Sequence, residues 1–282
     1  MLDFLWEPFA LGFMRRALAG CLALSAAAPP LGVFLVLRRM SLMSDVLQHG
    51  VLPGIAVGAI LTGLSVWAMG LGGIVAGFAI TVVAGWLTRR TGGREDSQLA
   101  GMYLVALAAG VALISTQHSI DLTHILFGNV LAVDDAALIS MAGVATLTLP
   151  VLALIWRPLV LESLDPGFMA ATTRNGGIWH LVFLMLVVLC VVSGFVALGT
   201  LMSVGLMMLP AISARHWSGS LAGQVRVAVL LACASSAGGL ILSFNLDIPA
   251  GPAIVLTAGG LWIASLVTGP HASLWRRAVP TA

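Results

Sequence analysis

The stretch WHLVFLMLVVLCVVSGFVAL, residues 179–198, decides the class of this protein. It contains no Asp, Glu, Lys or Arg, and about 20 mostly apolar residues are what an α-helix needs to cross the hydrocarbon of a bilayer. The rest of the chain has a similar composition: 60% of its 282 residues are hydrophobic and 9% are charged. Soluble domains are about 45–50% apolar and about 25% charged. The sequence therefore predicts an integral membrane protein made of helices.

Eight runs have the length and composition of membrane-spanning helices. They lie at about 17–37, 51–69, 71–88, 99–116, 136–155, 179–198, 225–243 and 252–268. A ninth, shorter piece at 201–213 contains Pro210 and either crosses the membrane or enters it as a re-entrant half-helix. Since no linker or repeat divides the chain, we expect residues 1–282 to form a single all-α domain of eight or nine membrane helices.

Two details of these spans are predicted from single residues. Met69 to Leu71 leaves room only for a tight hairpin between the second and third spans. Pro29 and Pro30 lie inside the first span, where each removes a helical hydrogen bond, so a kink is expected there. The first span would also fit a cleaved signal peptide, but its apolar run continues through LGVFLVL, residues 31–37, which favours a retained helix.

The thirteen basic residues are all Arg, and they predict the orientation. With nine crossings and the N-terminus outside, only Arg15 and Arg16 lie on the outer side. The inner loops then hold the others: Arg38, Arg39, Arg89, Arg90, Arg94, Arg157, Arg174, Arg215, Arg226, Arg276 and Arg277. Cytoplasmic loops of membrane proteins carry such an excess, so the C-terminus is predicted to be inside.

The composition also excludes several functions. Without any Lys the chain lacks the P-loop lysine, so it does not bind and split ATP by that route. A net charge of +2 gives no indication of nucleic-acid binding. The sequence has no H-E-x-x-H, no G-x-S-x-G and no acid pair beside a nucleophile, so a membrane-embedded enzyme is not expected.

Asp45 and His49, in RRMSLMSDVLQHGVLPGIAVG (38–58), are the first candidate site. Four residues apart, they share one face of a helix. A carboxylate and an imidazole suit divalent ions such as Zn²⁺ or Mn²⁺, and two ligands would allow release as well as binding. Met43 and Gln48 are possible neighbours. Alternatively, Asp45 stabilises a helix start through the helix dipole and His49 lies at the membrane interface.

Two loops carry further candidates. In the outer loop, His118, Asp121 and His124 are spaced by three and either form a first binding site for a cation or are ordinary loop residues; Asp134 and Asp135 behind them are expected to cap the next span. The inner loop 156–178 contains a short helix that Asp165-Pro166 begins and Gly176-Gly177 ends. That helix either docks another protein or is a simple connector.

Glycines are placed for close helix contacts. Gly54 with Gly58, and Gly73 with Gly77, have the small-x-x-x-small spacing that allows two helix backbones to approach.

Several of these segments together resemble the membrane-spanning permease subunit of ABC importers for zinc, manganese or iron. The resembling segments, in the family's order and spacing, are 5–20, 32–58, 125–133, 164–176, 197–215 and 247–256. They cover both ends and most of the middle of the chain. The resemblance implies the all-helical fold shared with cobalamin and siderophore permeases.

The family resemblance also implies partners and cargo. It implies a homodimer in the cytoplasmic membrane of a bacterium, with two separate ATP-binding subunits on the inner face and an extracytoplasmic metal-binding protein. It implies no permanently bound cofactor, and a transported divalent metal, zinc first and manganese next. Two departures from the family pattern are Pro29-Pro30 and the triplet Gln48-His49-Gly50 in place of Ser-His-Ala.

The resemblance assigns residues as well. Asp45 and His49 match the family's pathway ligands, and Asp165, Pro166 and Phe168 match its coupling helix, about 164–176, which contacts the ATPase. Two rival functions remain at this point: a permease for a metal chelate with the same fold, and a stand-alone, proton-coupled cation transporter.

Overall fold

The computed structural model describes residues 8–63, 65–91, 95–115, 130–164 and 176–271. Within these ranges the chain is helical, without a strand. The elements, in chain order, are α2 (Gly12–Leu37), α3 (Met43–Gly50), α4 (Leu52–Thr62), α5 (Val66–Thr91), α6 (Glu95–Ser115), the 3₁₀ turn η1 (Val130–Ala132), α8 (Asp135–Leu164), α10 (Gly176–Leu198), α11 (Thr200–Ala214), α12 (Leu221–Leu246) and α13 (Ala250–Thr268). The predicted all-α class is confirmed.

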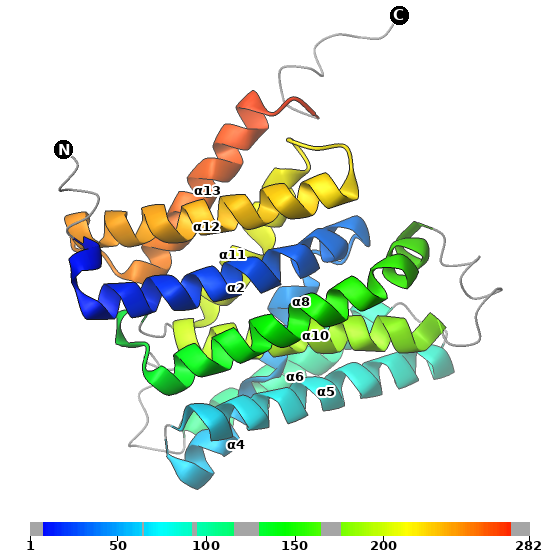
Figure 1. Ribbon diagram of the computed structural model, residues 1–282. Coiled ribbons are helices and arrows are strands. Elements are labelled where there is room, and N and C mark those ends of the chain that lie inside the picture. The colour runs from blue at the N-terminus through cyan, green and yellow to red at the C-terminus, as the bar shows by residue number, and fades with distance from the viewer. Residues whose placement is uncertain (1–7, 64, 92–94, 116–129, 165–175, 272–282) are drawn as a thin grey trace, which may run out of the picture.

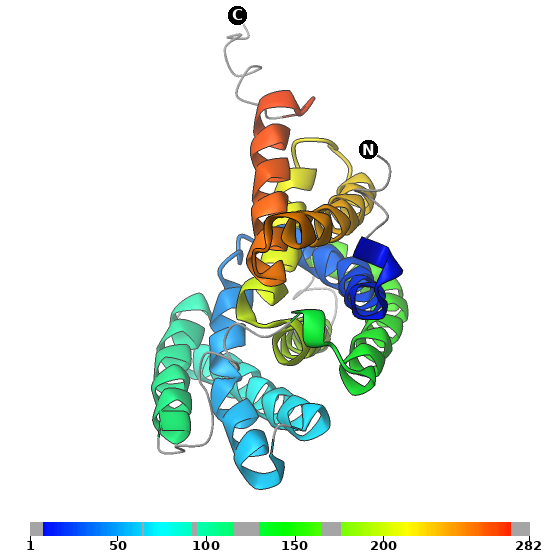
Figure 2. The same ribbon diagram turned by 90° about the vertical axis from the view of Figure 1, so that its left-hand side faces the viewer.

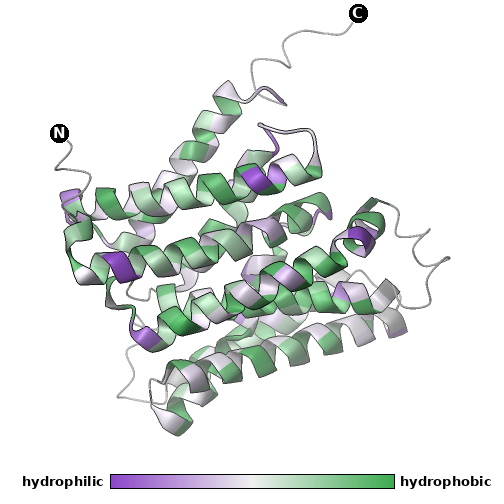
Figure 3. Cartoon of the chain, in the orientation of Figure 1, coloured by the Kyte–Doolittle hydropathy of each residue, from purple (hydrophilic) through white to green (hydrophobic). Residues whose placement is uncertain are grey.

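The long helices lie side by side, and their ends form two opposite faces of the molecule (Figure 1). The ends of α2, α5 and α8 and the starts of α10 and α12 gather on the right of that view. We call this the arginine-rich end, because the helix termini there carry Arg38, Arg90, Arg157 and Arg226. The helix bodies between the two faces are mainly hydrophobic (Figure 3). This is the arrangement expected of a bundle that crosses a bilayer.

Seven of the described helices are long and apolar enough to cross a membrane, and two apolar helices, 97–113 and 200–214, are shorter. The predicted total of eight or nine membrane helices agrees with this inventory. α11 is the short piece expected at 201–213: its 15 residues rise about 22 Å, less than the hydrocarbon thickness of about 30 Å. Most of α11 is buried among other helices, where a short helix does not expose its ends to lipid.

The hairpin between the second and third spans lies earlier than predicted. α4 ends at Thr62 and α5 begins at Val66, so Met69 and Leu71 are inside a helix. Gly63 marks the turn with a φ of 76°, a left-handed conformation that glycine adopts without strain. The prediction of a turn at Met69–Leu71 was wrong because hydropathy falls only slightly across residues 62–71, whereas the backbone turns where glycine permits it.

The central helices are α2 and α10, each buried over 72% of its most apolar window. α2 packs against α8, α11 and α12, and it continues without a break through Pro29 and Pro30, both buried. α5 and α8 are mostly exposed on the single chain, 22% and 28% buried. Viewed along the bundle, α4, α5 and α6 form one group and α11, α12 and α13 another, with α2 and α10 between them (Figure 2).

The glycine spacing predicted from the sequence produces close helix contacts. A Cβ built on Gly54 would come within 2.0 Å of the carbonyl oxygen of Gly72, and one on Gly58 within 2.4 Å of the carbonyl oxygen of Ala68. α4 and α5 therefore touch backbone to backbone. A Cβ on Gly73 or Gly77 would come within 2.9 Å or 2.5 Å of a valine side chain of α10. These contacts fix the position of α4, which continues from the short helix α3.

Candidate metal site

The short helix α3 carries the predicted metal site. A compact turn leads into it from α2: Arg39 has a φ of 60°, and the Met40 amide donates to the Leu35 carbonyl at 2.9 Å. Leu47 and Val51 are fully buried and anchor α3 to the core. α3 then passes into α4 at Val51, whose amide still bonds to the Leu47 carbonyl at 3.0 Å.

Asp45 and His49 face each other on α3, as their spacing predicts. His49 Nε2 lies 3.7 Å from Asp45 Oδ1. Two ligands bound at about 2.1 Å around a tetrahedral ion are about 3.4 Å apart, so a small side-chain rotation brings both atoms onto one ion. On the single chain the His49 side chain is 27% exposed and the Asp45 side chain is 54% exposed, which leaves the site open on one side. The predicted convergence of the pair is confirmed.

His49 is oriented by α6. Its ring centroid lies 5.9 Å from that of Tyr103, with the planes inclined at 41°. Nδ1 of His49 is buried without a hydrogen-bond partner in the described part of the chain. The nitrogen directed to Asp45, Nε2, is therefore the one placed to bind an ion.

Unpaired polar atoms concentrate on α3. Ser44 Oγ and Gln48 Oε1 are buried without a partner, as is His49 Nδ1; the other such atoms in the described residues lie in Thr88 and Ser193. Buried polar groups are normally hydrogen-bonded, and an unpaired one costs about 1–3 kcal/mol. α3 therefore carries buried polar atoms that the neighbouring described residues do not hydrogen-bond.

The described residues supply only a partial coordination shell. No group of three or more His, Cys, Asp or Glu side chains comes together in the parts of the chain that the structure describes. A structural zinc site needs four ligands from the protein. A site with one carboxylate and one imidazole instead suits an ion that is bound briefly and passed on.

The remaining predicted residues have different outcomes. His118, Asp121 and His124 lie outside the described residues, and so do Asp165, Pro166 and Phe168. The expected cap before the fifth span is confirmed: Asp134 Oδ1 accepts a hydrogen bond from the Ala137 amide at 2.8 Å. Asp135 pairs with Arg16 at 3.3 Å, and both side chains are exposed.

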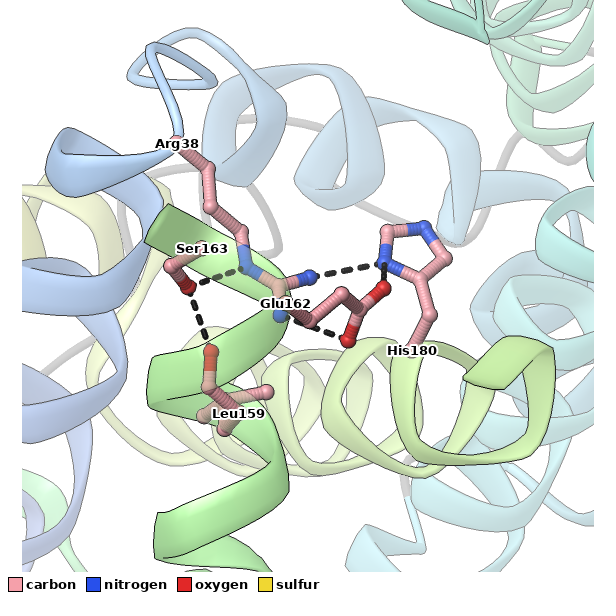
Figure 4. A network of polar contacts seen from close by, with 5 residues as sticks. All are labelled: Arg38, Leu159, Glu162, Ser163 and His180. Carbon is pink, nitrogen blue, oxygen red and sulfur yellow. Dashed lines mark hydrogen bonds and ion pairs between the residues drawn. The ribbon is translucent and has the colours of Figure 1, made fainter. Parts of the chain in front are cut away.

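A polar cluster that the sequence did not predict lies at the arginine-rich end and is formed by Arg38, Glu162, Ser163 and His180 (Figure 4). Arg38 ends α2, Glu162 and Ser163 lie in the last turn of α8, and His180 lies in the first turns of α10. The Arg38 guanidinium reaches Glu162 Oε2 at 2.9 Å, Ser163 Oγ at 3.0 Å and His180 Nδ1 at 2.8 Å. The available signal was an Arg directly after an apolar run, which predicts a polar partner but not which one.

Comparison with known protein families assigns the chain over nearly its full length. The sequence profile described as "ABC 3 transport family" matches residues 10–269. The manganese import system permease protein ScaB of Streptococcus parasanguinis is 33% identical over 92% of this chain and 91% of its own. A probable iron transport system membrane protein of Haemophilus influenzae is 30% identical over 94% and 97%.

Solved structures agree with this fold. The structure described as PsaBC from Streptococcus pneumoniae in complex with Fab matches with a TM-score of 0.85 and 27% identity, covering 99% of both chains. An inward-facing conformation of a putative metal-chelate type ABC transporter matches with a TM-score of 0.69, over 89% of this chain and 84% of that one. At 19% identity the second match bears on the fold alone.

Proposed function

The chain belongs to the ABC 3 transport family as a membrane permease of metal importers, and on that premise we propose that it carries manganese into the cell through Asp45 and His49. The observation that supports this most directly is the Asp45–His49 pair itself, 3.7 Å apart on a helix where Ser44 Oγ and Gln48 Oε1 are buried without a partner in the described residues. An ionisable pair in a membrane-spanning segment is expensive to keep unless it serves the transported species.

Manganese replaces zinc as the preferred cargo for two reasons. ScaB of Streptococcus parasanguinis carries manganese import in its name, and the sequence resemblance that placed zinc first did not discriminate between the two. A carboxylate, an imidazole and a nearby amide oxygen on Gln48 form a donor set with more oxygen than zinc sites usually have, and oxygen ligands suit Mn²⁺. Iron, which the Haemophilus influenzae relative is named for, is the competing cargo.

A second copy of the chain completes the pathway in this proposal. Asp45 is half exposed on the single chain, although its helix is part of a candidate membrane span, Met43–Thr62. A carboxylate in that position must face a water-filled pathway or another protein surface rather than lipid. Two copies facing each other would supply two aspartates and two histidines around one path.

The ATP-binding subunits belong at the arginine-rich end. Positive loops face the cytoplasm, so this end is inside, the N-terminus outside, and the bundle spans the inner membrane of a bacterium. Asp165, Pro166 and Phe168, which the family resemblance assigns to the coupling helix, come in the sequence just after Leu164, the last residue of α8, and this supports docking of an ATPase at this end. The chain itself supplies no P-loop lysine, so ATP hydrolysis belongs to those partners.

Transport then proceeds by alternating access. An extracytoplasmic binding protein delivers the ion on the outer side, where His118, Asp121 and His124 form the first contact. The ion moves to the Asp45 carboxylate and His49 Nε2, which replace part of its hydration shell. ATP binding and hydrolysis by the partners rock the helices between outward-facing and inward-facing arrangements, and weak two-ligand coordination from each copy permits release.

The test is uptake of Mn²⁺ by the reconstituted complex with its ATPase subunits and binding protein. Asp45→Ala and His49→Ala are expected to abolish uptake while the complex still assembles. Asp135→Ala is the control, because it removes another exposed carboxylate, at the start of α8 and away from the α3 site. Normal uptake in both α3 variants would refute the site, and uptake without ATP would favour a secondary transporter.

The choice of metal is tested in the same vesicles. Mn²⁺ uptake should be competed by excess Mn²⁺ more strongly than by equal Zn²⁺ or by an iron chelate. Preferential competition by zinc would show that zinc is the preferred cargo. Competition by the chelate would indicate a chelate permease.

A further inference from the structure

We propose that Arg38, together with Glu162 and His180, is the positioning cluster that transmits movement from the ends of α8 and α10 to the metal-binding helix α3. The inference rests on the proposed function, since it assigns a role to the inner-face ATPase contact. It names residues that touch neither the ion nor ATP.

The cluster joins three elements that are distant in sequence. Arg38 Nη2 donates to Glu162 Oε2 at 2.9 Å across 124 residues, and Nη1 donates to His180 Nδ1 at 2.8 Å across 142 residues. Nε donates to Ser163 Oγ at 3.0 Å, and that hydroxyl donates to the Leu159 carbonyl at 2.6 Å. Figure 4 shows the guanidinium between the end of α8 and the start of α10. All three guanidinium nitrogens of Arg38 donate a hydrogen bond, a pattern that the single ammonium group of a lysine cannot reproduce.

His180 accepts within the cluster. A guanidinium only donates, so Nδ1 of His180 accepts the hydrogen bond from Arg38. The same Nδ1 lies 3.5 Å from Glu162 Oε1, and the shorter ion pair, at 2.9 Å, joins Arg38 to Glu162. Phe183 of α10 covers the guanidinium, with its ring centroid 4.9 Å from Cζ.

Burial makes the cluster sensitive to relative movement. The Arg38 and Glu162 side chains are 8% and 17% exposed, whereas the Arg16–Asp135 pair at the outer end is 54% and 73% exposed. A buried charge that loses its partner is strongly destabilising, more so than an exposed one. α2, α8 and α10 are therefore held together at this end, and a shift of α8 or α10 carries Arg38 with it.

The path from Arg38 to the metal site is short and stiff. Arg38 is bonded back to α2 through its amide to the Phe34 carbonyl at 3.0 Å, and the Met43 amide that begins α3 bonds to the Met40 carbonyl at 3.0 Å. Since the amides of Arg39 and Met40 also bond back to α2, to the carbonyls of Val36 and Leu35, the turn is tied to both helices, and displacement of Arg38 displaces α3. α10 also packs directly against α3, so the two routes reinforce each other.

One side of the cluster has room for such movement. A cavity of about 390 Å³ lies between α5 and α10 and is lined by His180 together with Thr81, Trp86 and Leu184. Because side chains do not fill the space between α5 and α10 at this level, the start of α10 has room to shift there without displacing packed side chains. The cluster is thus held by hydrogen bonds to α2 and α8, and on its α5 side it borders this open space.

The experiment measures Mn²⁺ transported per ATP hydrolysed by the full complex in vesicles. Arg38→Gln and Glu162→Gln are expected to lower this ratio at least tenfold while ATP hydrolysis continues. Arg39→Gln, at the adjacent exposed arginine outside the cluster, should stay within twofold of the unchanged protein. A purely structural role would reduce the amount of complex and leave the ratio intact.

The double variant Arg38→Gln/Glu162→Gln separates the two roles further. It leaves no unpaired buried charge, so the complex should assemble normally, yet the ratio should remain low because the link is gone. A wild-type ratio in this variant overturns the proposal. If it does not assemble, Arg38→Lys is measured instead: it keeps the ion pair but loses the fork, and an unchanged ratio there also overturns the proposal. Failure of the unchanged complex to move Mn²⁺ would instead refute the proposed function.

Discussion

Replacing Gly54 with alanine tests the backbone contact that positions the site-bearing helices. In the structure, a Cβ at Gly54 would lie 2.0 Å from the Gly72 carbonyl oxygen and 2.6 Å from the Ala76 Cβ. A carbon and an oxygen in contact are separated by about 3.3 Å, so α4 and α5 must move apart by about 1.3 Å. The obstacle is main chain, which cannot rotate away as a side chain does.

The loss in the free energy of unfolding expected for Gly54→Ala is at the high end of the range for over-packed cores. Inserting a methyl group into a filled core costs about 1–3 kcal/mol, and a gap of about 0.5–1 Å elsewhere along the interface forfeits a quarter to a half of its dispersion energy. We therefore expect Gly54→Ala to lose about 3 kcal/mol, which corresponds to a fall of about 6–12 °C in the unfolding midpoint. Because α3 continues into α4 at Val51, Mn²⁺ uptake should fall as well.

The assay is thermal unfolding of the purified chain in detergent, with Gly85→Ala as the matched control. Gly85 lies in α5, and a Cβ there meets nothing within 4 Å. The same chemical change at that position should leave the midpoint unchanged or raise it slightly, since alanine favours the helix by up to about 1 kcal/mol. If Gly54→Ala unfolds within about 1 °C of Gly85→Ala, α4 and α5 do not touch as described.

Three further changes probe single contacts, each by thermal unfolding. Asp134→Ala should cost about 1 kcal/mol by removing the cap on the Ala137 amide, while Asp134→Asn retains it. Ser25→Ala should cost about 0.6 kcal/mol by breaking the buried 3.0 Å bond to Ser236, and changing both serines should cost no more than that. Gln48→Leu should gain about 1 kcal/mol by removing an unpaired buried amide oxygen, and yet lower Mn²⁺ uptake; unchanged uptake would exclude the amide from the ion's path.

The features that the sequence predicted correctly depend on geometry within one helix. Asp45 and His49 converge because residues four apart share a helix face, whatever the surrounding fold. Asp134 caps α8 because a carboxylate just before a helix can accept a hydrogen bond from a free amide in the first helical turn, here that of Ala137. In each case the partner lies within one turn, so no knowledge of the tertiary arrangement was needed.

Boundaries within continuous apolar sequence were harder to predict. Residues 51–71 read as apolar on both sides of Gly63, and the hydropathy pattern placed the turn too late. What decides the turn is backbone conformation: Gly63 adopts φ 76°, and the next helix begins at Val66. A membrane protein does not mark its turns with strongly polar residues wherever two spans pack closely, so glycine is the better signal there.

The Arg38 cluster was predictable in part from the sequence. Arg38 directly follows an apolar span, and its side chain is 8% exposed. A buried guanidinium requires an acid, and the chain has only 11 acidic residues. Glu162 and Asp165 are the acids of residues 156–178, the loop predicted to lie on the same side as Arg38, so the pairing of α2 with the end of α8 was one of a small number of possibilities. His180 carries no such charge requirement, and only the fold brings it across 142 residues to complete the fork.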